Sequence, residues 1–167
     1  VFAIPFEERH GGLGADLLTL CLAIEQISRH CATSGLILAV QALGAIPIQI
    51  AGTPEQQDRW LPGLASGEKL IAFGLTEADH GSDPGGMMLT RAEKRGEKYI
   101  VHGRKWFISG AEGASHFILV ARTSDDPRRG LTAFLFDRDQ PGWEIVRRIP
   151  IMGPEEHGGH CELSFDG

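Results

Sequence analysis

The hydrophobic pattern of the chain changes at Ala72-Phe73-Gly74-Leu75-Thr76-Glu77-Ala78-Asp79-His80-Gly81-Ser82-Asp83-Pro84. An apolar run from Leu70 to Leu75 predicts a short buried strand, and the residues that follow it are small and polar. Such a loop leaves the Thr76 hydroxyl and free backbone N–H groups at the strand end, while Gly81 and Ser82 let the backbone approach a ligand closely. The pattern suits a ligand-binding strand end, but on spacing alone it favours a polar loop with a turn at Asp83-Pro84.

The residues before this stretch, from about 15 to 66, have the period of helices. An apolar stripe within residues 15–27 predicts the first helix. Residues 33–51 are apolar on nearly every side, as in a helix that is buried on most faces, and Pro47 predicts a kink or a break within it.

A third helix is predicted to begin at Thr53. Thr53 serves as its N-cap, Pro54 takes the first helical position, and Gln56 completes a capping box. The helix is predicted to end near Pro62-Gly63 or Ser66-Gly67.

The residues after Gly67 have the period of strands. Turns are predicted at Arg95-Gly96-Glu97 and at His102-Gly103. Strands that follow one another without intervening helices pair antiparallel, as in a barrel or a sandwich. The fold class is therefore α+β, with a helical segment at 1–68 and an antiparallel β-barrel-like domain at 69–167. The predicted strands lie within 70–75, 90–95, 98–109, 116–123, 131–137, 143–149 and 160–165, and the ranges 90–95 and 98–109 together form two or three strands.

A second informative stretch is Gly103-Arg104-Lys105-Trp106-Phe107-Ile108-Ser109-Gly110-Ala111. Side chains alternate along a strand, so Phe107 and Ser109 are predicted to share one face, with Trp106 and Ile108 on the other. An aromatic ring with a hydroxyl two residues further on suits a planar heteroaromatic ligand. The same alternation also describes one core face and one surface face.

The composition argues against several classes of partner and site. The net charge of −6 argues against a nucleic-acid partner, which requires a basic face. Three widely separated cysteines suit a reduced compartment better than a disulfide framework. No apolar run approaches the roughly 18 residues that span a membrane, so no membrane partner is expected. His157 and His160 have too weak a spacing to predict a metal site.

Several blocks, in order, resemble the acyl-CoA dehydrogenase family over nearly the whole chain. Beside the two stretches quoted above, these blocks are Gly11-Gly12-Leu13-Gly14, the segment from Ala51 to Pro62, and Met152-Gly153 with the strand after it. The resemblance implies a helical N-terminal domain, a β-barrel-like middle domain and a further C-terminal helical domain, with FAD between the last two. Because the chain starts at Val1 and stops at Gly167, both ends look like cuts in a longer protein.

The resemblance also implies a set of site residues. Thr76 would bond the flavin ring, Ser82 would lie near the flavin pyrophosphate or the CoA chain of the substrate, and Ser109 would bond near flavin N5. Trp106 and Phe107 compete for the aromatic position beside the flavin, and alternation favours Phe107. The sequence departs from the family at Phe73, Ala78 and His80. The cofactor-binding residues implied are Phe73, Leu75, Thr76, Gly81, Ser82, Trp106, Phe107 and Ser109.

The implied reaction is the α,β-dehydrogenation of a fatty acyl-CoA thioester, as in β-oxidation, with electron-transfer flavoprotein as the acceptor. The family's catalytic glutamate lies in the C-terminal domain and matches no residue here, and Glu77 is interpreted as a structural acid. The fragment alone is therefore expected to be inactive. The resemblance further implies a homo-oligomer in the bacterial cytoplasm or, in a eukaryote, the mitochondrial matrix. A flavin monooxygenase or oxidase on the same fold, and a non-catalytic binding module, remain alternatives.

Overall fold

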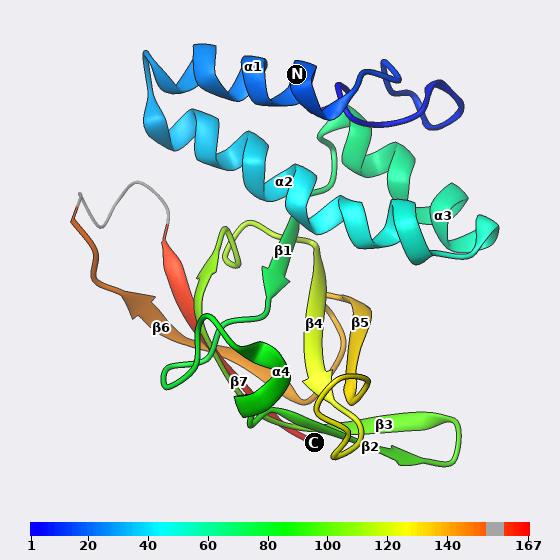
Figure 1. Cartoon of the computed structure of the whole chain (residues 1–167), viewed down its shortest axis with the longest axis vertical. Helices are drawn as coiled ribbons and strands as arrows, with labels where there is room; N and C mark the ends of the chain where they lie inside the picture. Colours follow the sequence, from blue (N-terminus) through cyan, green and yellow to red (C-terminus); the bar gives the residue numbers. More distant parts are fainter. Residues whose placement is uncertain (153–158) are drawn as a thin grey trace. The chain divides into compact units, whose positions relative to one another are not determined.

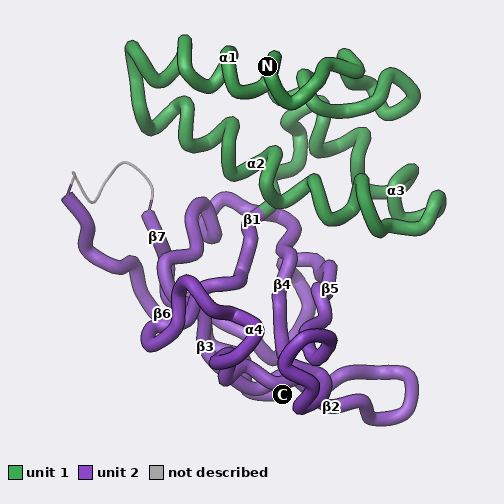
Figure 2. Tube along the Cα trace, in the orientation of Figure 1, with its two compact units in different colours: residues 1–71 green, residues 72–167 purple. Residues whose placement is uncertain are grey.

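The computed structural model describes residues 1–152 and 159–167. The chain divides into two compact units, Val1–Ile71 and Ala72–Gly167 (Figure 2). The first unit is helical and the second is built on a sheet, so the predicted α+β class is confirmed. The family boundary predicted after residue 68 lies shortly before the division between these units.

The helical unit contains η1 (Glu8–His10), α1 (Leu17–Ser28), α2 (Ala32–Ala51) and α3 (Pro54–Ser66). Asp16 caps α1 by accepting a hydrogen bond from the Thr19 backbone N–H at 2.8 Å. The predicted capping box of α3 is present, with Thr53 and Gln56 bonding each other's backbone N–H groups. Gly67 ends α3 in the left-handed conformation, at the second of the two predicted positions.

The helix α2 corrects two expectations. It runs as one helix through Pro47, so the break predicted as one of two outcomes there is absent. It is also long and apolar enough, by length and composition alone, to cross a membrane, although no such run was expected. The core helix of a soluble protein passes the same test.

The side chain of Gln41 shows how α2 is held. Its Nε2 donates to the Leu64 carbonyl at 3.0 Å and to the Lys69 carbonyl at 2.8 Å, and its Oε1 accepts from the Ile71 N–H at 3.1 Å. Nearby, a Cβ at Gly44 would lie 2.5 Å from the Ile71 side chain. A buried amide and a close backbone approach therefore fix the segment that leads out of α3.

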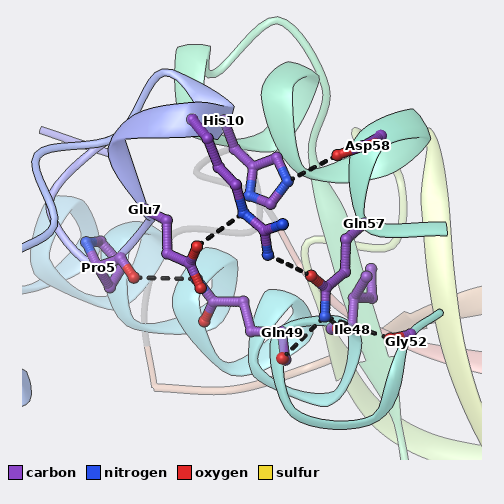
Figure 3. Close-up of polar contacts among 9 residues, drawn as sticks. Pro5, Glu7, His10, Ile48, Gln49, Gly52, Gln57 and Asp58 are labelled. Atoms are coloured by element: carbon purple, nitrogen blue, oxygen red, sulfur yellow. Dashed lines mark hydrogen bonds and ion pairs between the residues drawn. The ribbon is translucent and has the colours of Figure 1, made fainter. Parts of the chain in front are cut away.

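A second polar cluster joins η1, α2 and α3 (Figure 3). The buried His10 has its Nε2 3.1 Å from the Asp58 carboxylate. Gln57 Nε2 reaches the carbonyl oxygens of Ile48, Gln49 and Gly52 at the C-terminal end of α2, at 3.1–3.3 Å. These bonds add a partner for carbonyl groups at the end of the helix, of which that of Ile48 also accepts from the Gly52 N–H at 2.9 Å.

The β unit holds a seven-stranded sheet and the short helix α4 (Pro84–Met87) (Figure 1). Its strand order is β1-β4-β2-β3-β7-β6, with β5 paired to β4. Pairing is antiparallel between β2 and β3, β3 and β7, β4 and β5, and β6 and β7, while β2 meets β4 in parallel at one pair of residues. The strands are β1 (Ile71–Gly74), β2 (Arg91–Arg95), β3 (Lys98–Ser109), β4 (His116–Arg122), β5 (Leu131–Asp137), β6 (Trp143–Ile149) and β7 (His160–Asp166).

The strand β3 pairs with two other strands. Its first residues pair with β2 and its last residues pair with β7, and the exchange occurs at His102-Gly103. Gly103 has φ 147°, and a Cβ there would lie 2.5–2.8 Å from Thr90 atoms. The predicted turn at His102-Gly103 is wrong, because the glycine bends a continuous strand. The predicted turn at Gly96 is present, with φ 64°.

Aromatic rings fill the core of the β unit. Phe117 stacks on Phe136 at 5.0 Å between centroids, and Trp143 lies 4.7 Å from Phe117. Phe165 completes the cluster from β7. As predicted, Cys161, Leu163 and Phe165 share the core side of β7.

Candidate functional site

A buried ion pair supports the loop after β1. Lys105 Nζ lies 2.9 Å from Glu77 Oε1 and also donates to the Leu75 carbonyl at 2.9 Å. The Glu77 carboxylate accepts two backbone N–H bonds, from Leu89 at 2.7 Å and from Thr90 at 2.9 Å. The Lys105 side chain is fully buried and that of Glu77 is 7% exposed.

The two partners respond differently to burial. Burial raises the pKa of Glu77, but the hydrogen bonds from Thr90, Leu89 and Lys105 outweigh it, so the net shift is downward. Burial lowers the pKa of Lys105, and the Glu77 carboxylate opposes that shift. Glu77 is therefore held as a carboxylate by its own chain, which agrees with its interpretation as a structural acid.

The ion pair places Thr76 against β3. With Leu75 and Glu77 both tied to Lys105, the Thr76 carbonyl accepts a hydrogen bond from the Trp106 N–H at 2.8 Å. The side chains of Phe73, Leu75 and Thr76 are each partly buried. The strand end thus lies beside the second informative stretch, as a shared site requires.

A β-bulge interrupts β3 where the aromatic pair lies. The pairing with β7 shifts register between Lys105 and Ile108, and both of these side chains are buried. Trp106 and Phe107 occupy the space between them, and Phe107 adopts φ 57° and is 47% exposed. The prediction that Trp106 and Ile108 share a face is wrong, because the extra residue breaks the alternation.

His160, on β7, joins Phe107 to Ser109. Ser109 and His160 are paired across the strands, and Ser109 Oγ lies 2.7 Å from His160 Nδ1. The Phe107 ring meets the His160 ring edge-on, with centroids 6.2 Å apart. The predicted pair Phe107 and Ser109 therefore does gather on one side, around a histidine that sequence reasoning considered only as a metal ligand.

A second ion-pair network supports Trp106. Glu162 is buried and binds Arg104 Nη1 and Arg147 Nε, each at 2.9 Å. The Arg147 guanidinium also lies over the Trp106 ring, 5.2 Å from its centroid. The Arg147 side chain is thus engaged by both Glu162 and Trp106. Glu162 was missed because strand alternation alone gives no signal for a buried acid.

The loop after Glu77 presents Gly81 and Ser82. Glu77 and His80 exchange backbone hydrogen bonds, and Gly81 and Ser82 are exposed. A Cβ at Gly81 would meet nothing within 4 Å, so the chain itself does not require a glycine there. The next residue, Asp83, caps α4.

The arrangement fits a flavin. A half-exposed aromatic ring in a left-handed backbone, which costs about 1–2 kcal/mol, is kept out of the core by a bulge and offers a surface for stacking. The Ser109 hydroxyl on the same side and the Thr76 segment supply polar groups for the edge of such a ring.

Metal binding has no comparable support. In residues 1–152 and 159–167, no three His, Cys, Asp or Glu side chains gather in a way that could hold a metal ion. His157 and Gly153, which sequence analysis singled out, lie outside the described residues.

Family models match both units. The N-terminal domain of acyl-CoA dehydrogenase matches residues 1–68, and the middle domain of acyl-CoA dehydrogenase matches residues 72–167. The chain belongs to the acyl-CoA dehydrogenase family.

Individual relatives agree with this membership. An acyl-CoA dehydrogenase of Bacillus subtilis is 40% identical over 169 residues, covering 99% of this chain and 44% of the relative. A solved structure from work on the electron transferring flavoprotein of Acidaminococcus fermentans has a TM-score of 0.90 and 34% identity, covering 98% of this chain and 43% of that chain. An acyl-CoA dehydrogenase of Bacillus anthracis in complex with FAD has a TM-score of 0.86 and 30% identity, covering 99% and 28%. This acyl-CoA dehydrogenase chain thus spans less than half the length of these relatives.

Proposed function

We propose that the protein carrying this chain catalyses the FAD-dependent α,β-dehydrogenation of an acyl-CoA thioester, and that the chain supplies one wall of the flavin site. The observation that carries the proposal is the bulge that holds Phe107 half-exposed beside the Ser109 hydroxyl. Family membership and the FAD complex of the Bacillus anthracis relative support the choice of cofactor.

Each site residue has a proposed task. Bound FAD supplies the acceptor for the hydride that leaves the β-carbon of the substrate. Phe107 packs against the ring system, Ser109 bonds its reactive edge, and Thr76 bonds its polar edge. Trp106, fixed under Arg147, supports Phe107 at 5.9 Å between ring centroids. Phe73 and Leu75 line the strand end.

The exposed loop has the second proposed task. Gly81 lets the backbone approach the ligand, and Ser82 offers its hydroxyl to the flavin pyrophosphate or to the CoA part of the substrate. We place the proton-abstracting base outside residues 1–167, because Glu77 is buried in its ion pair with Lys105. The isolated chain is therefore expected to show no turnover.

The proposed electron acceptor is an electron-transfer flavoprotein, supported by the likeness to the structure from Acidaminococcus fermentans. A fatty acyl chain, as in β-oxidation, is the proposed substrate class. A homo-oligomer in the cytoplasm, or in the mitochondrial matrix of a eukaryote, completes the proposal. Two exposed free cysteines, Cys21 and Cys31, suit such a reducing compartment.

The test uses the natural full-length protein. We expect it to carry flavin absorbance that saturated acyl-CoA thioesters bleach in the absence of oxygen. Phe107→Ala is expected to weaken FAD binding about two- to tenfold, since an aromatic stacking contact contributes about 0.5–1.5 kcal/mol. Tyr99→Ala is the matched control, because Tyr99 is an exposed aromatic residue on the same strand, outside the site.

Other outcomes identify the alternatives. A colourless protein with no affinity for added FAD would refute the proposal and favour a non-catalytic binding module. Oxygen consumption coupled to acyl-CoA oxidation or hydroxylation would favour an oxidase or monooxygenase on the same fold.

A further inference from the structure

His160 and Ser109 form a short hydrogen bond across two paired strands. The residues are opposite each other in the register of β3 and β7, and the Oγ–Nδ1 distance is 2.7 Å. Both side chains are partly buried. A bond of this length lies at the short end of the range for hydroxyl and ring nitrogen groups, so the two atoms share one well-placed proton.

The His160 ring is fixed from several directions. Its strand lies between β3 and β6, with Ile149 as its partner on the second side. The Gly110 N–H donates to the carbonyl of the preceding residue, Gly159, at 3.3 Å. The edge-on contact with Phe107 restrains the ring itself. A ring held in this way gives the Ser109 hydroxyl a defined direction.

The shared proton decides what Ser109 offers to a further ligand. A serine hydroxyl has one proton and two lone pairs. When Nδ1 accepts that proton, Ser109 Oγ presents only lone pairs elsewhere. When Nδ1 is itself protonated and donates, the Ser109 proton is free for another acceptor.

We infer that His160 is a positioning residue whose Nδ1 accepts the Ser109 proton, so that Ser109 Oγ acts as a hydrogen-bond acceptor toward the flavin edge. The inference rests on the proposed function, which places Ser109 at the reactive nitrogen of the ring. That nitrogen carries a proton only in the reduced cofactor. A Ser109 hydroxyl that only accepts hydrogen bonds therefore favours the reduced form of the cofactor. Without His160, the hydroxyl proton can instead bond the unprotonated nitrogen of the oxidised form.

The decisive measurement is the midpoint potential of bound FAD in the full-length protein. His160→Ala is expected to change the ratio of the affinities for reduced and oxidised FAD about tenfold toward the oxidised form, which lowers a two-electron potential by about 30 mV. His160→Asn places an amide oxygen near the position of Nδ1 and is expected to restore most of this shift. In a Ser109→Ala background, His160→Ala is expected to have no further effect.

A second measurement needs no cofactor. Nitrogen NMR of the imidazole in the FAD-free protein is expected to show an unprotonated Nδ1, whose signal shifts in Ser109→Ala. A protonated Nδ1 would overturn the inferred direction of the bond.

The outcomes separate the two proposals. If the wild type binds FAD and His160→Ala leaves the potential unchanged, raises it, or acts equally in the Ser109→Ala background, the role of His160 is overturned while the proposed function stands. If the wild type binds no FAD, both fail. An unchanged thermal midpoint in His160→Ala excludes general destabilisation as the cause of a shifted potential.

Discussion

The segments before and after β1 are both held by buried polar side chains, but of different kinds. Before the strand, the neutral amide of Gln41 binds Lys69 and Ile71. After it, the ammonium group of Lys105 binds Leu75 and Glu77. One anchor is a neutral set of hydrogen bonds and the other is a charge pair removed from water.

The two anchors differ in the free energy that is lost when one partner is removed. A buried neutral group that loses its partner costs about 1–3 kcal/mol, whereas a buried charge that loses its partner costs about 3–5 kcal/mol. The charged anchor supports the candidate site, where Thr76 has to stay beside Trp106. The segment after β1, which holds the candidate site, is therefore expected to tolerate substitution less well than the segment before it.

The largest expected effect is at Lys105. Lys105→Met leaves the Glu77 carboxylate buried without its counter-charge and is expected to lower the free energy of unfolding by about 3–5 kcal/mol. Denaturant unfolding measures this change. The double variant Lys105→Met/Glu77→Gln removes both charges and is expected to recover part of the loss. A single variant that loses no more stability than Gln41→Leu would show that the charged anchor is not the less tolerant of the two.

The second prediction concerns Glu77 and pH. Glu77→Gln keeps hydrogen-bonding atoms but leaves the buried Lys105 ammonium without its counter-charge, so a loss comparable to that in Lys105→Met is expected at neutral pH. Because the fold holds the pKa of Glu77 below 4.5, its carboxylate stabilises the fold above that pH, and this contribution is lost as the pH falls through and below 4.5.

The stability difference between wild type and Glu77→Gln is therefore expected to be full at neutral pH and to shrink in acid. Thermal midpoints of both proteins across this pH range provide the measurement. A difference that stays constant, or grows in acid, would contradict the role of the charged form.

The neutral anchor gives the next effect. Gln41→Leu leaves the Ile71 N–H and two carbonyl groups without the amide, and we expect a loss of about 1–3 kcal/mol in denaturant unfolding. Gln49→Leu is the matched control on the same helix, because Gln49 is only partly buried and gives one bond, to the Pro5 carbonyl at 2.9 Å. Equal losses in the two variants would show that the buried amide of Gln41 stabilises the fold no more than the partly buried amide of Gln49.

The smallest expected effect is at the start of α3. Thr53→Ala removes one half of the capping box and is expected to cost about 1 kcal/mol, measured as a lower denaturant midpoint. Thr53→Ser keeps the hydroxyl and is expected to retain most of the stability. No difference between the two variants would show that the cap contributes little.

Local patterns predicted the elements whose causes are local. The cap at Thr53, the helix end at Gly67 and the turn at Gly96 depend on neighbouring residues, so a single sequence displays their signals. The continuation of α2 through Pro47 was not predicted, because propensity marks proline as a helix breaker and tertiary context can override propensity.

The candidate site also combines features with local causes and features that depend on distant residues. Thr76, Phe107 and Ser109 were recognised as candidates from short motifs, and their assignment to a flavin stays a prediction. The bulge at Trp106-Phe107 depends on the register against β7, about fifty residues away in the chain, as the Ser109–His160 bond also does. Strand alternation assumes regular pairing and therefore could not reveal either feature.

The bend at Gly103 connects the hairpin of β2 and β3 to the candidate site. Any side chain there would displace Thr90, whose N–H holds the Glu77 carboxylate at 2.9 Å. Because Glu77 and Leu75 both bind the Lys105 ammonium, the disturbance would reach Leu75 and Thr76 of the proposed flavin site although neither residue is substituted. An added methyl group at Gly103 is therefore expected to weaken the proposed site from a distance, through crowding between β3 and Thr90.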